Sequence, residues 1–441
     1  MHRVPNSDRS PSRRRISLAG ATTACFAALA LLAGCTGGGA GDSTGTPTGS
    51  ATPTSTGGSS SAPAPVALAA VITTSPQGDG KKISPAKPVT VSIANGKLTS
   101  VTMTSPSGKA VKGVVSPDGA SWHNTEVLGY SKTYSISATG ANGDGKPVTK
   151  RETITTVTPD NMTMPYLQRI GGYPLGHGAT YGVAIVPIVH FDEPIGNETA
   201  AQKALTVTTT PHVDGSWYWS DSQNVHWRPQ HYWASGTKVT VTAKVYGKKL
   251  GDGLYGQADT SASFTIGRRQ VTIAHDTAPK SVNKVKVYNA AGHLIRTMNT
   301  SMGEHSGVSV KGNYINFYTL DGTYTVLAHE QPAKMCSASY GLPANAPGGY
   351  ACENIYNATK ISTDGIYLHE LLTTIYAQDN GYDVSHGCLN LNAANSMWFF
   401  KHSMIGDPVE IKGAKHAPTL QVDQGGDWTV PWSKWLKGSA L

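Results

Sequence analysis

The stretch DVSHGCLNL, from Asp383 to Leu391, places a histidine, a glycine and a cysteine in direct succession between apolar and β-branched residues. A cysteine in such a setting has four possible roles: a small buried apolar residue, one half of a disulfide, a metal ligand or a nucleophile. Each role makes a different demand on the other cysteines and histidines of the chain. The interpretation of this 441-residue sequence therefore starts from Cys388.

A nucleophilic role requires a base, because only the thiolate attacks and a free cysteine has a pKa of about 8.5. His369 lies 19 residues before Cys388 in DGIYLHELL, a predicted strand, and can reach the thiol across a sheet. His386 shares a face with Cys388 in an extended segment, but two residues of separation give poor geometry for proton transfer. We predict His369 as the base, His386 as an orienting residue, and the N–H groups of Gly387 and Cys388 as oxyanion donors.

The other three roles of Cys388 are less well supported. A zinc site made of His369, His386 and Cys388 needs a fourth ligand, and no CxxC or HxxxH spacing accompanies them. An inert buried cysteine rarely has two histidines and a glycine near it. Cys336 and Cys352 make a better disulfide pair, because they lie 16 residues apart around a Gly/Pro/Asn-rich stretch interpreted as a lid-like loop. Such a bond stabilises by about 3 kcal/mol and leaves Cys388 as the free thiol.

The N-terminus carries a targeting signal. Residues 1–34 combine arginines with an apolar stretch and end before Cys35 in LAGC, which is similar to a bacterial lipobox. An ordinary membrane anchor or a cleaved secretory signal is the alternative. Residues 35–66 form a Gly/Ser/Thr/Pro-rich segment that cannot bury a core, so we expect a disordered tether. The prediction is an exported lipoprotein, lipidated at Cys35 and anchored to the outer face of the plasma membrane, facing the cell wall.

The composition favours β structure and weakens the case for nucleic acid. Charged residues make up only 15% of the chain, and the net charge of +8 includes five arginines against one aspartate in the first 34 residues. Alternating strands separated by Gly and Asn turns predict two immunoglobulin-like modules, at 67–158 and 159–267. The modules share a repeat at an offset of 105 residues that matches Trp122 with Trp227, and we expect both tryptophans to be core residues.

Residues 268–413 have a different pattern, with a hairpin signature around NAAG, the lid-like loop, and a helix in NLNAANSMWFFKHSMIG. Asn390 or Asn392 can cap this helix, and Trp398, Phe399 and Met404 are predicted on its apolar side. DPVEIK reads as a last strand. Residues 414–441 form an extension with three tryptophans and no clear period.

The pair GIYLH and SHGCLN resembles the catalytic signature of the L,D-transpeptidase (YkuD-type) family, with 15 residues between His369 and Ser385. The tether, the two modules and the tail GDWTVPWSKW also resemble the lipid-anchored actinobacterial members. The resemblance implies a mainly β chain: two immunoglobulin-like β-sandwich modules, a β-rich catalytic domain with a short helix, and a Trp-rich C-terminal extension. The positions that the resemblance assigns to substrate binding are Tyr350 in the lid, Met335, Asp364, Gly365, Ser385 and Asn390.

The activity implied by the resemblance is two-step acyl transfer on peptidoglycan. Cys388 attacks a tetrapeptide stem and releases D-Ala, and the amine of a second stem resolves the thioester to give a 3→3 cross-link. No cofactor and no metal are implied, and carbapenems are expected to acylate Cys388. Two alternatives stay open: an L,D-carboxypeptidase, in which water resolves the same thioester, and a non-catalytic lipoprotein that binds wall polymers.

Overall fold

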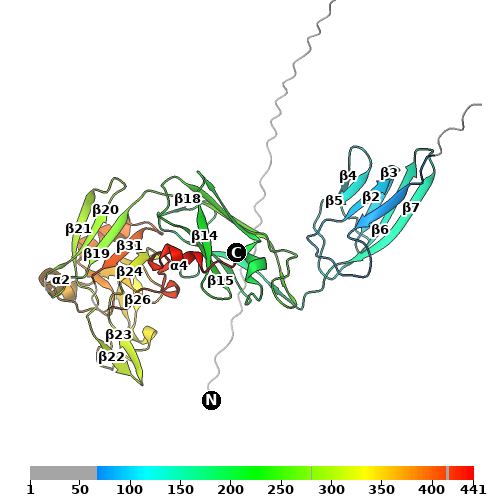
Figure 1. Ribbon diagram of the computed structural model, residues 1–441. Coiled ribbons are helices and arrows are strands. Elements are labelled where there is room, and N and C mark those ends of the chain that lie inside the picture. The colour runs from blue at the N-terminus through cyan, green and yellow to red at the C-terminus, as the bar shows by residue number, and fades with distance from the viewer. Residues whose placement is uncertain (1–66, 280, 414–416) are drawn as a thin grey trace, which may run out of the picture. The chain divides into compact units, whose positions relative to one another are not determined.

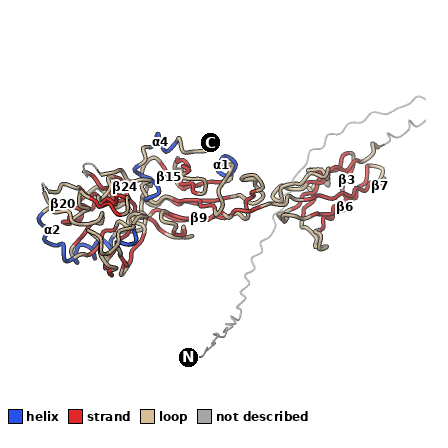
Figure 2. Tube along the Cα trace, turned by 90° about the horizontal axis from the view of Figure 1, so that it is seen from below, coloured by secondary structure: helices blue, strands red, loops and turns tan. Residues whose placement is uncertain are grey.

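The computed structural model describes residues 67–279, 281–413 and 417–441 (Figure 1). The predicted signal peptide, the lipidation site Cys35 and the tether lie outside the described residues, so those predictions stay predictions. The described residues belong to one compact unit. Strands dominate it and its helices are short, as Figure 2 shows. In the described part of the chain, no helix is both long enough and apolar enough to cross a membrane.

The first module is a sandwich of two antiparallel sheets, as the alternating sequence predicts. One sheet has the order β1-β2-β5-β4 and the other the order β3-β6-β7. The strands are β1 (Val71–Ser75), β2 (Thr90–Ala94), β3 (Gly96–Thr104), β4 (Gly113–Val115), β5 (Ser121–Asn124), β6 (Thr133–Asn142) and β7 (Pro147–Thr155).

The second module also packs two sheets, with the orders β10-β9-β12-β15-β14 and β11-β18-β16-β13, beside the short pair β17-β8. Its elements are β8 (Asn161–Thr163), β9 (Pro165–Arg169), β10 (Tyr173–Pro174), β11 (Thr180–Tyr181), β12 (Pro187–Phe191), α1 (Glu198–Gln202), β13 (Leu205–Thr210), β14 (Gly215–Trp219), β15 (Asn224–Pro229), β16 (Lys238–Ala243), β17 (Leu254–Gly256) and β18 (Thr260–Ile266).

The repeated tryptophans occupy equivalent places in the two cores, so their predicted role is confirmed. Trp122 on β5 and Trp227 on β15 are 4% and 5% exposed. Each ring is covered by a glycine of the neighbouring strand: a Cβ on Gly113 would lie 2.1 Å from Trp122, and one on Gly215 would lie 2.2 Å from Trp227. A side chain cannot fit there, so the glycine belongs to the repeat as much as the tryptophan does.

The third region joins a five-stranded sheet, β21-β20-β19-β31-β24, to a four-stranded sheet, β25-β28-β29-β30. Its strands are β19 (Val271–His275), β20 (Asn283–Tyr288), β21 (Leu294–Thr300), β22 (Gly307–Val310), β23 (Asn313–Asn316), β24 (Gly322–Thr325), β25 (Ala328–Glu330), β26 (Ala333–Met335), β27 (Glu353–Ile355), β28 (Ala358–Lys360), β29 (Tyr367–Glu370), β30 (Leu389–Leu391) and β31 (Pro408–Lys412).

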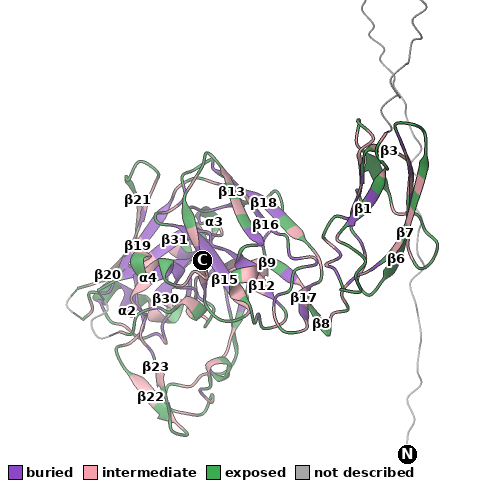
Figure 3. Ribbon diagram, turned by 45° about the vertical axis from the view of Figure 1, so that its right-hand side comes forward, coloured by how far each residue is buried: buried purple, intermediate pink, exposed green. Residues whose placement is uncertain are grey.

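Helices of this region and of the C-terminal extension are short. They are η1 (Ser337–Tyr340), η2 (Leu372–Thr374), α2 (Ile375–Asn380), α3 (Ala393–His402), η3 (Val422–Gln424), η4 (Asp427–Thr429) and α4 (Trp432–Leu436), where η marks a 3₁₀ helix. The strands β22 and β23 form a hairpin that projects from the rest of this region and is largely solvent-accessible, whereas β31 is buried (Figures 1 and 3).

Several local predictions for this region are confirmed. The turn at Asn289–Gly292 joins β20 to β21. Asn392 caps α3, because its side chain accepts a hydrogen bond from the N–H of Asn395 at 2.9 Å. Phe399 is buried on this helix, but Met404 lies beyond its end at His402, so its predicted place on the helix is wrong. The C-cap Ser403 is extended, and the chain turns away there.

The tryptophan-rich tail packs on the second module through Arg228, which is only 2% exposed. The Arg228 guanidinium lies 4.3 Å from the ring centre of Trp435 and 4.9 Å from that of Trp428. It also donates to the carbonyl of Val430 at 2.6 Å. These cation–π contacts stabilise the buried guanidinium, for which the described residues provide no directly paired carboxylate. The spacing of the tryptophans in the tail follows these contacts with one arginine, so it has no helical or strand periodicity.

Candidate active site

The catalytic histidine and cysteine predicted from the sequence come from adjacent strands. β29 and β30 pair in parallel, with Leu368 opposite Leu389 and His369 opposite Asn390. Cys388 immediately precedes β30, and His369 and Cys388 line the same cavity, which fits the expected approach across a sheet. Parallel neighbours require a crossover connection, and here η2 and α2 supply it. This crossover is the reason that the two residues are 19 positions apart in the sequence.

Cys388 is the one free cysteine of the described residues. It is half-buried, and its thiol donates to the carbonyl of Gly365 at 3.6 Å. Burial raises the pKa of this thiol to about 12, because the thiolate loses its hydration there, while a backbone hydrogen bond from Tyr367 opposes the rise. The empty site therefore holds a protonated thiol.

His369 is 4% exposed, and its Nδ1 lies 3.0 Å from the carbonyl oxygen of Glu370. A carbonyl only accepts, so Nδ1 carries the proton and Nε2 keeps a free lone pair. Burial lowers the pKa of His369 to about 4, and the hydrogen bond to Glu370 opposes that shift. At neutral pH the ring is uncharged and can act as a base through Nε2.

Ser385 and Gly387 form the turn that carries Cys388. The Ser385 hydroxyl donates to the carbonyl of Cys388 at 2.6 Å and accepts from the N–H of Gly387 at 3.1 Å. Gly387 has a φ of 123°, and a Cβ there would lie 2.5 Å from the Cδ1 of Ile366. Because Ser385 takes the Gly387 N–H, that group is not available to an oxyanion in this structure, which corrects the role predicted for it. The Cys388 N–H stays a predicted donor.

His386 connects the nucleophile turn to the lid-like loop. Its Nε2 lies 2.8 Å from the carbonyl oxygen of Gly348, and its ring meets that of Phe317 edge-on at 4.3 Å. The ring of Tyr350, in the lid, lies 5.4 Å away. These contacts fit the orienting role predicted for His386, since both its ring and the lid are held in place.

Two cavities meet at Cys388. The larger, of about 590 Å³, is lined by the predicted residues Asp364 and Gly365 and by the β22–β23 hairpin. The smaller, of about 220 Å³, is lined by His369, Ser385 and Asn390. The residues that line both are Met335, Tyr350, His386 and Cys388. The structure thus gathers every predicted catalytic and substrate-binding residue except Gly387 at one of the two cavities.

Asn390 is the polar group whose environment most clearly indicates a ligand. It is 1% exposed, and neither its amide nitrogen nor its amide oxygen has a hydrogen-bond partner among the described residues. A buried amide without partners is costly, and bound substrate would remove this cost. By contrast, the carboxylate of Asp364 already accepts from Ser362 and from Gln424, so it shapes the turn before β29.

The predicted disulfide between Cys336 and Cys352 is present. It closes the lid at the end of the β26–β27 pair, where Met335 lies opposite Glu353. Inside the loop, the hydroxyl of Ser337 donates to the carbonyl of Tyr350 at 2.8 Å and accepts from its N–H at 2.9 Å. The disulfide and these two bonds fix the backbone at Tyr350, and hence the wall that both cavities share.

Sequence reasoning missed two groups that hold the site. Thr319 is 1% exposed and its hydroxyl donates to the carbonyl of Gly387 at 2.8 Å, from a position 68 residues away. Besides the predicted Asp364, three charged side chains line the cavities, Lys334 and Lys360 in the larger one and Glu353 in the smaller one. Lys334 precedes the predicted Met335 and Glu353 follows the predicted Cys352. This adjacency in the sequence could have indicated that both charged residues lie at the site. Thr319 offered no such signal.

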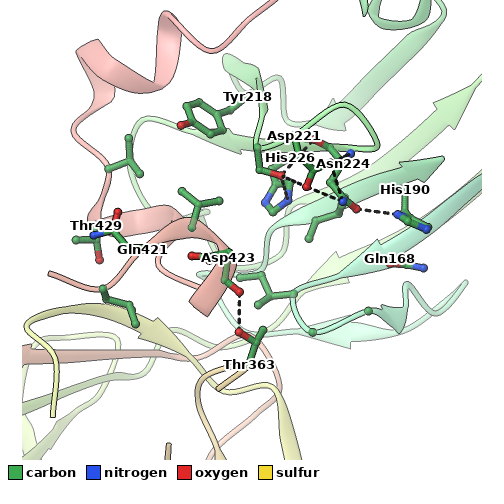
Figure 4. Close-up of a pocket in the computed structure, with 18 of the residues that line it drawn as sticks. Gln168, His190, Tyr218, Asp221, Asn224, His226, Thr363, Gln421, Asp423 and Thr429 are labelled. Carbon is green, nitrogen blue, oxygen red and sulfur yellow. Dashed lines mark hydrogen bonds between the residues drawn. The ribbon is translucent and has the colours of Figure 1, made fainter. Parts of the chain in front are cut away.

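A cavity of about 1040 Å³, larger than the two at Cys388, does not contain the thiol (Figure 4). It lies among the second module, the C-terminal extension and Thr363. His226 lines it, and its Nδ1 is 2.6 Å from the buried carboxylate of Asp427. The Ser220 hydroxyl is 3.3 Å from the His226 Nε2 and equally close to the carbonyl of Asn224. Ser220 directly follows β14 and its N–H donates to Asn224, so it is a diagonal neighbour of His226 on β15. We interpret this group as a structural contact between the module and the tail.

Comparison with known proteins gives matches over the two immunoglobulin-like modules and over the region that contains Cys388. Residues 280–411 match the family described as L,D-transpeptidase catalytic domain, and residues 80–249 match the bacterial Ig domain family. L,D-transpeptidase 2 of Mycobacterium tuberculosis is 36% identical over 353 residues, which are 80% of this chain and 81% of that protein. L,D-transpeptidase 5 of the same species is 33% identical over 374 residues, 84% of this chain and 77% of that protein. A solved L,D-transpeptidase in complex with imipenem is 26% identical with a TM-score of 0.45, covering 56% of this chain and 99% of its own.

Proposed function

The chain belongs to the L,D-transpeptidase family, and from this premise we propose that it joins peptidoglycan stem peptides through a thioester on Cys388. The observation that carries the proposal is the meeting of two cavities at one free thiol. A transpeptidase needs a donor and an acceptor on opposite sides of the acyl bond. The larger cavity suits the donor stem, and the smaller one, which contains His369, suits the attacking acceptor.

The first step is acylation of Cys388. The sulfur attacks the carbonyl carbon of the third residue of a tetrapeptide stem, and the thiol proton passes to Nε2 of His369. The tetrahedral intermediate then expels the amine of the terminal D-Ala, which takes the proton from His369. One C–N bond is broken, one C–S bond is formed, and the enzyme holds a thioester. The Cys388 N–H is the donor we propose for the oxyanion.

The second step returns the enzyme to its starting state. An amine on the side chain of another stem attacks the thioester carbonyl from the smaller cavity, and its proton passes through His369 to the leaving sulfur. A C–N bond replaces the C–S bond, so the product is a 3→3 cross-link. The energy of the broken peptide bond is retained in the thioester, so neither nucleotide nor metal enters the balance. Water in place of the amine would give carboxypeptidase activity.

Charges around the two cavities support this assignment of donor and acceptor. Lys334 and Lys360 line the larger cavity, where the carboxylates of a donor stem would bind. Glu353, exposed on β27, lines the smaller cavity and attracts an acceptor ammonium. Asn390 offers unpaired amide groups beside the thiol.

We also propose that carbapenems acylate Cys388, since a strained lactam carbonyl is an electrophile of the same class as the stem carbonyl. The lipid anchor at Cys35 and a place on the outer face of the membrane belong to the proposal as well. They rest on the LAGC motif and the tether sequence. A Cys35→Ala chain is expected to lose membrane association and incorporation of labelled lipid, and retention of both would remove this part of the proposal.

The function is tested by incubating the chain with disaccharide-tetrapeptide and analysing the products by mass spectrometry. Cross-linked dimer with release of D-Ala supports the transpeptidase, whereas tripeptide alone supports the carboxypeptidase. Cys388→Ala is expected to abolish both products. Glu353→Gln is expected to shift products from dimer toward tripeptide. Turnover by Cys388→Ala, or no product from the parent chain, would contradict the mechanism.

A further inference from the structure

Three potential metal ligands converge behind the turn that carries Cys388. Asp276 follows β19, His305 lies between β21 and β22, and Asp383 lies five residues before Cys388. Nε2 of His305 is 2.7 Å from Oδ2 of Asp276 and 3.8 Å from Oδ2 of Asp383. One ligand atom from each residue lies within 4.8 Å of the other two. None of the three lines either cavity at the thiol.

This cluster contains more negative charge than its visible partners neutralise. The side chains of Asp276 and Asp383 are 1% and 6% exposed. Asp383 accepts from the amide of Asn283 and from the N–H of Met302, both neutral donors. Two enclosed carboxylates therefore share one imidazole.

Asp276 adds an independent indication that something is bound here. Its Oδ2 contacts His305, but its Oδ1 is buried and has no hydrogen-bond partner among the described residues. A buried carboxylate oxygen without a partner loses its hydration and gains nothing in return. A cation beside it would supply the missing interaction.

We propose that Asp276, His305 and Asp383 bind one divalent transition-metal ion, and that Zn²⁺ fits best. An imidazole nitrogen with two carboxylate oxygens is a ligand set for zinc, whereas Mg²⁺ and Ca²⁺ favour oxygen ligands alone. Tetrahedral zinc holds its ligand atoms about 3.4 Å apart, a value between the two separations observed. The His305 side chain is 33% exposed, so the fourth position is open to water.

The ion would act on structure rather than on the reaction, because it lies outside both cavities. Backbone bonds join the same segments: the Ser385 N–H donates to the carbonyl of Met302, and the Glu304 N–H donates to that of Ser385. A metal shared by Asp276, His305 and Asp383 would fasten the nucleophile turn to the end of β19. Its removal is therefore expected to loosen this turn and lower the melting temperature.

The test is titration of the purified full-length chain, stripped with a chelator, with ZnCl₂. The chain carries Cys388→Ala so that the catalytic thiol does not contribute. The expected result is saturable binding of one ion by calorimetry and a rise in melting temperature. His305→Gln and Asp383→Asn in the same background are expected to weaken this binding by about tenfold or more, as the loss of a ligand should.

His212→Gln is the matched control. His212 also contacts a carboxylate, Asp214 at 3.0 Å, but both side chains are exposed, and no third potential ligand accompanies them in the part of the chain that the structure describes. This variant is expected to bind zinc as the parent does. Unchanged zinc binding in both cluster variants would overturn the proposal, and so would a parent chain whose melting temperature does not respond to zinc. An equal loss of binding in His212→Gln would do the same.

Discussion

The pH dependence of acylation follows from the state of His369. Burial lowers its pKa from the ordinary value of 6.5 to about 4. Such a shift corresponds to about 3 kcal/mol disfavouring the imidazolium. The base must be unprotonated to accept the proton of Cys388, so activity is lost as the pH falls through the pKa of the folded enzyme. We therefore expect the acid limb of the rate profile near pH 4.

The pKa shift of His369 is large enough to distinguish a buried base from a base with the ordinary pKa. At pH 5, a base with a pKa of about 4 is roughly 90% unprotonated, whereas one with the ordinary value is only about 3% unprotonated. The acylation rate at pH 5 is thus expected to be within about 20% of that at pH 7, and not lower by about 25-fold as it would be for a base with the ordinary pKa. The assay is the rate of acyl-enzyme formation with imipenem, followed by mass spectrometry, with circular dichroism to show that the fold persists.

Two variants show which histidine determines the acid limb of the pH–rate profile. His386→Gln is expected to leave its position near pH 4, because His386 only orients the site. His369→Gln removes the general base and is expected to lower the rate by about 10²–10⁴-fold. A rate that falls about fivefold between pH 6.5 and 5.5 in the parent chain would refute the reasoning, because that is the fall expected for a base with the ordinary pKa of 6.5.

Three further changes test other parts of the structure. Replacing Cys336 and Cys352 by serine is expected to lower the free energy of unfolding by about 3 kcal/mol in urea titrations; an unchanged midpoint would show that the lid is held by other contacts. Trp435→Ala removes a ring that is fully buried against Arg228, and should cost about 3–5 kcal/mol by the same measurement, so a loss below 1 kcal/mol would contradict the tail packing. Asn390→Ala should lower kcat with the tetrapeptide by about tenfold or more while leaving the melting temperature within a few degrees, and unaltered kcat would exclude its contact with substrate.

Features of the fold that depend on local sequence were predictable. Alternation identified the sandwich strands, NAAG identified the hairpin, and an asparagine preceding an apolar period identified the start of α3. Two features that depend on distant segments were not. β31 pairs with both β19 and β24, and nothing in DPVEIK specifies these partners. α2 was also missed, because the segment Leu372–Asn380 is rich in β-branched and aromatic residues that weaken the helix signal.

The residues of the site also divide into those that local sequence identifies and those that depend on distant segments. Cys388, His369 and the cysteine pair follow from residue chemistry and spacing, so the sequence was sufficient to find them. Thr319 holds Gly387 across 68 positions, and only the folded chain brings them together. The turn made by Ser385 was accessible in principle, since serine hydroxyls commonly bond to the backbone two or three residues away. Because the Ser385 hydroxyl accepts the hydrogen bond from the Gly387 N–H, this N–H is not available to an oxyanion.

Burial at this site favours the neutral form of each group that the proposed reaction would use. It disfavours the thiolate of Cys388 and the imidazolium of His369, and it would equally lower the pKa of an acceptor ammonium that enters the smaller cavity. An amine with its ordinary pKa is protonated and cannot attack, so its desolvation next to the thioester is required for the second step. Glu353 fits this requirement because it is exposed: it attracts the ammonium where water still screens it, and the proton is lost as the amine moves inward. On the mechanism proposed above, burial in the smaller cavity would favour an amine over water as the acceptor, because water gains no nucleophilicity from the same transfer.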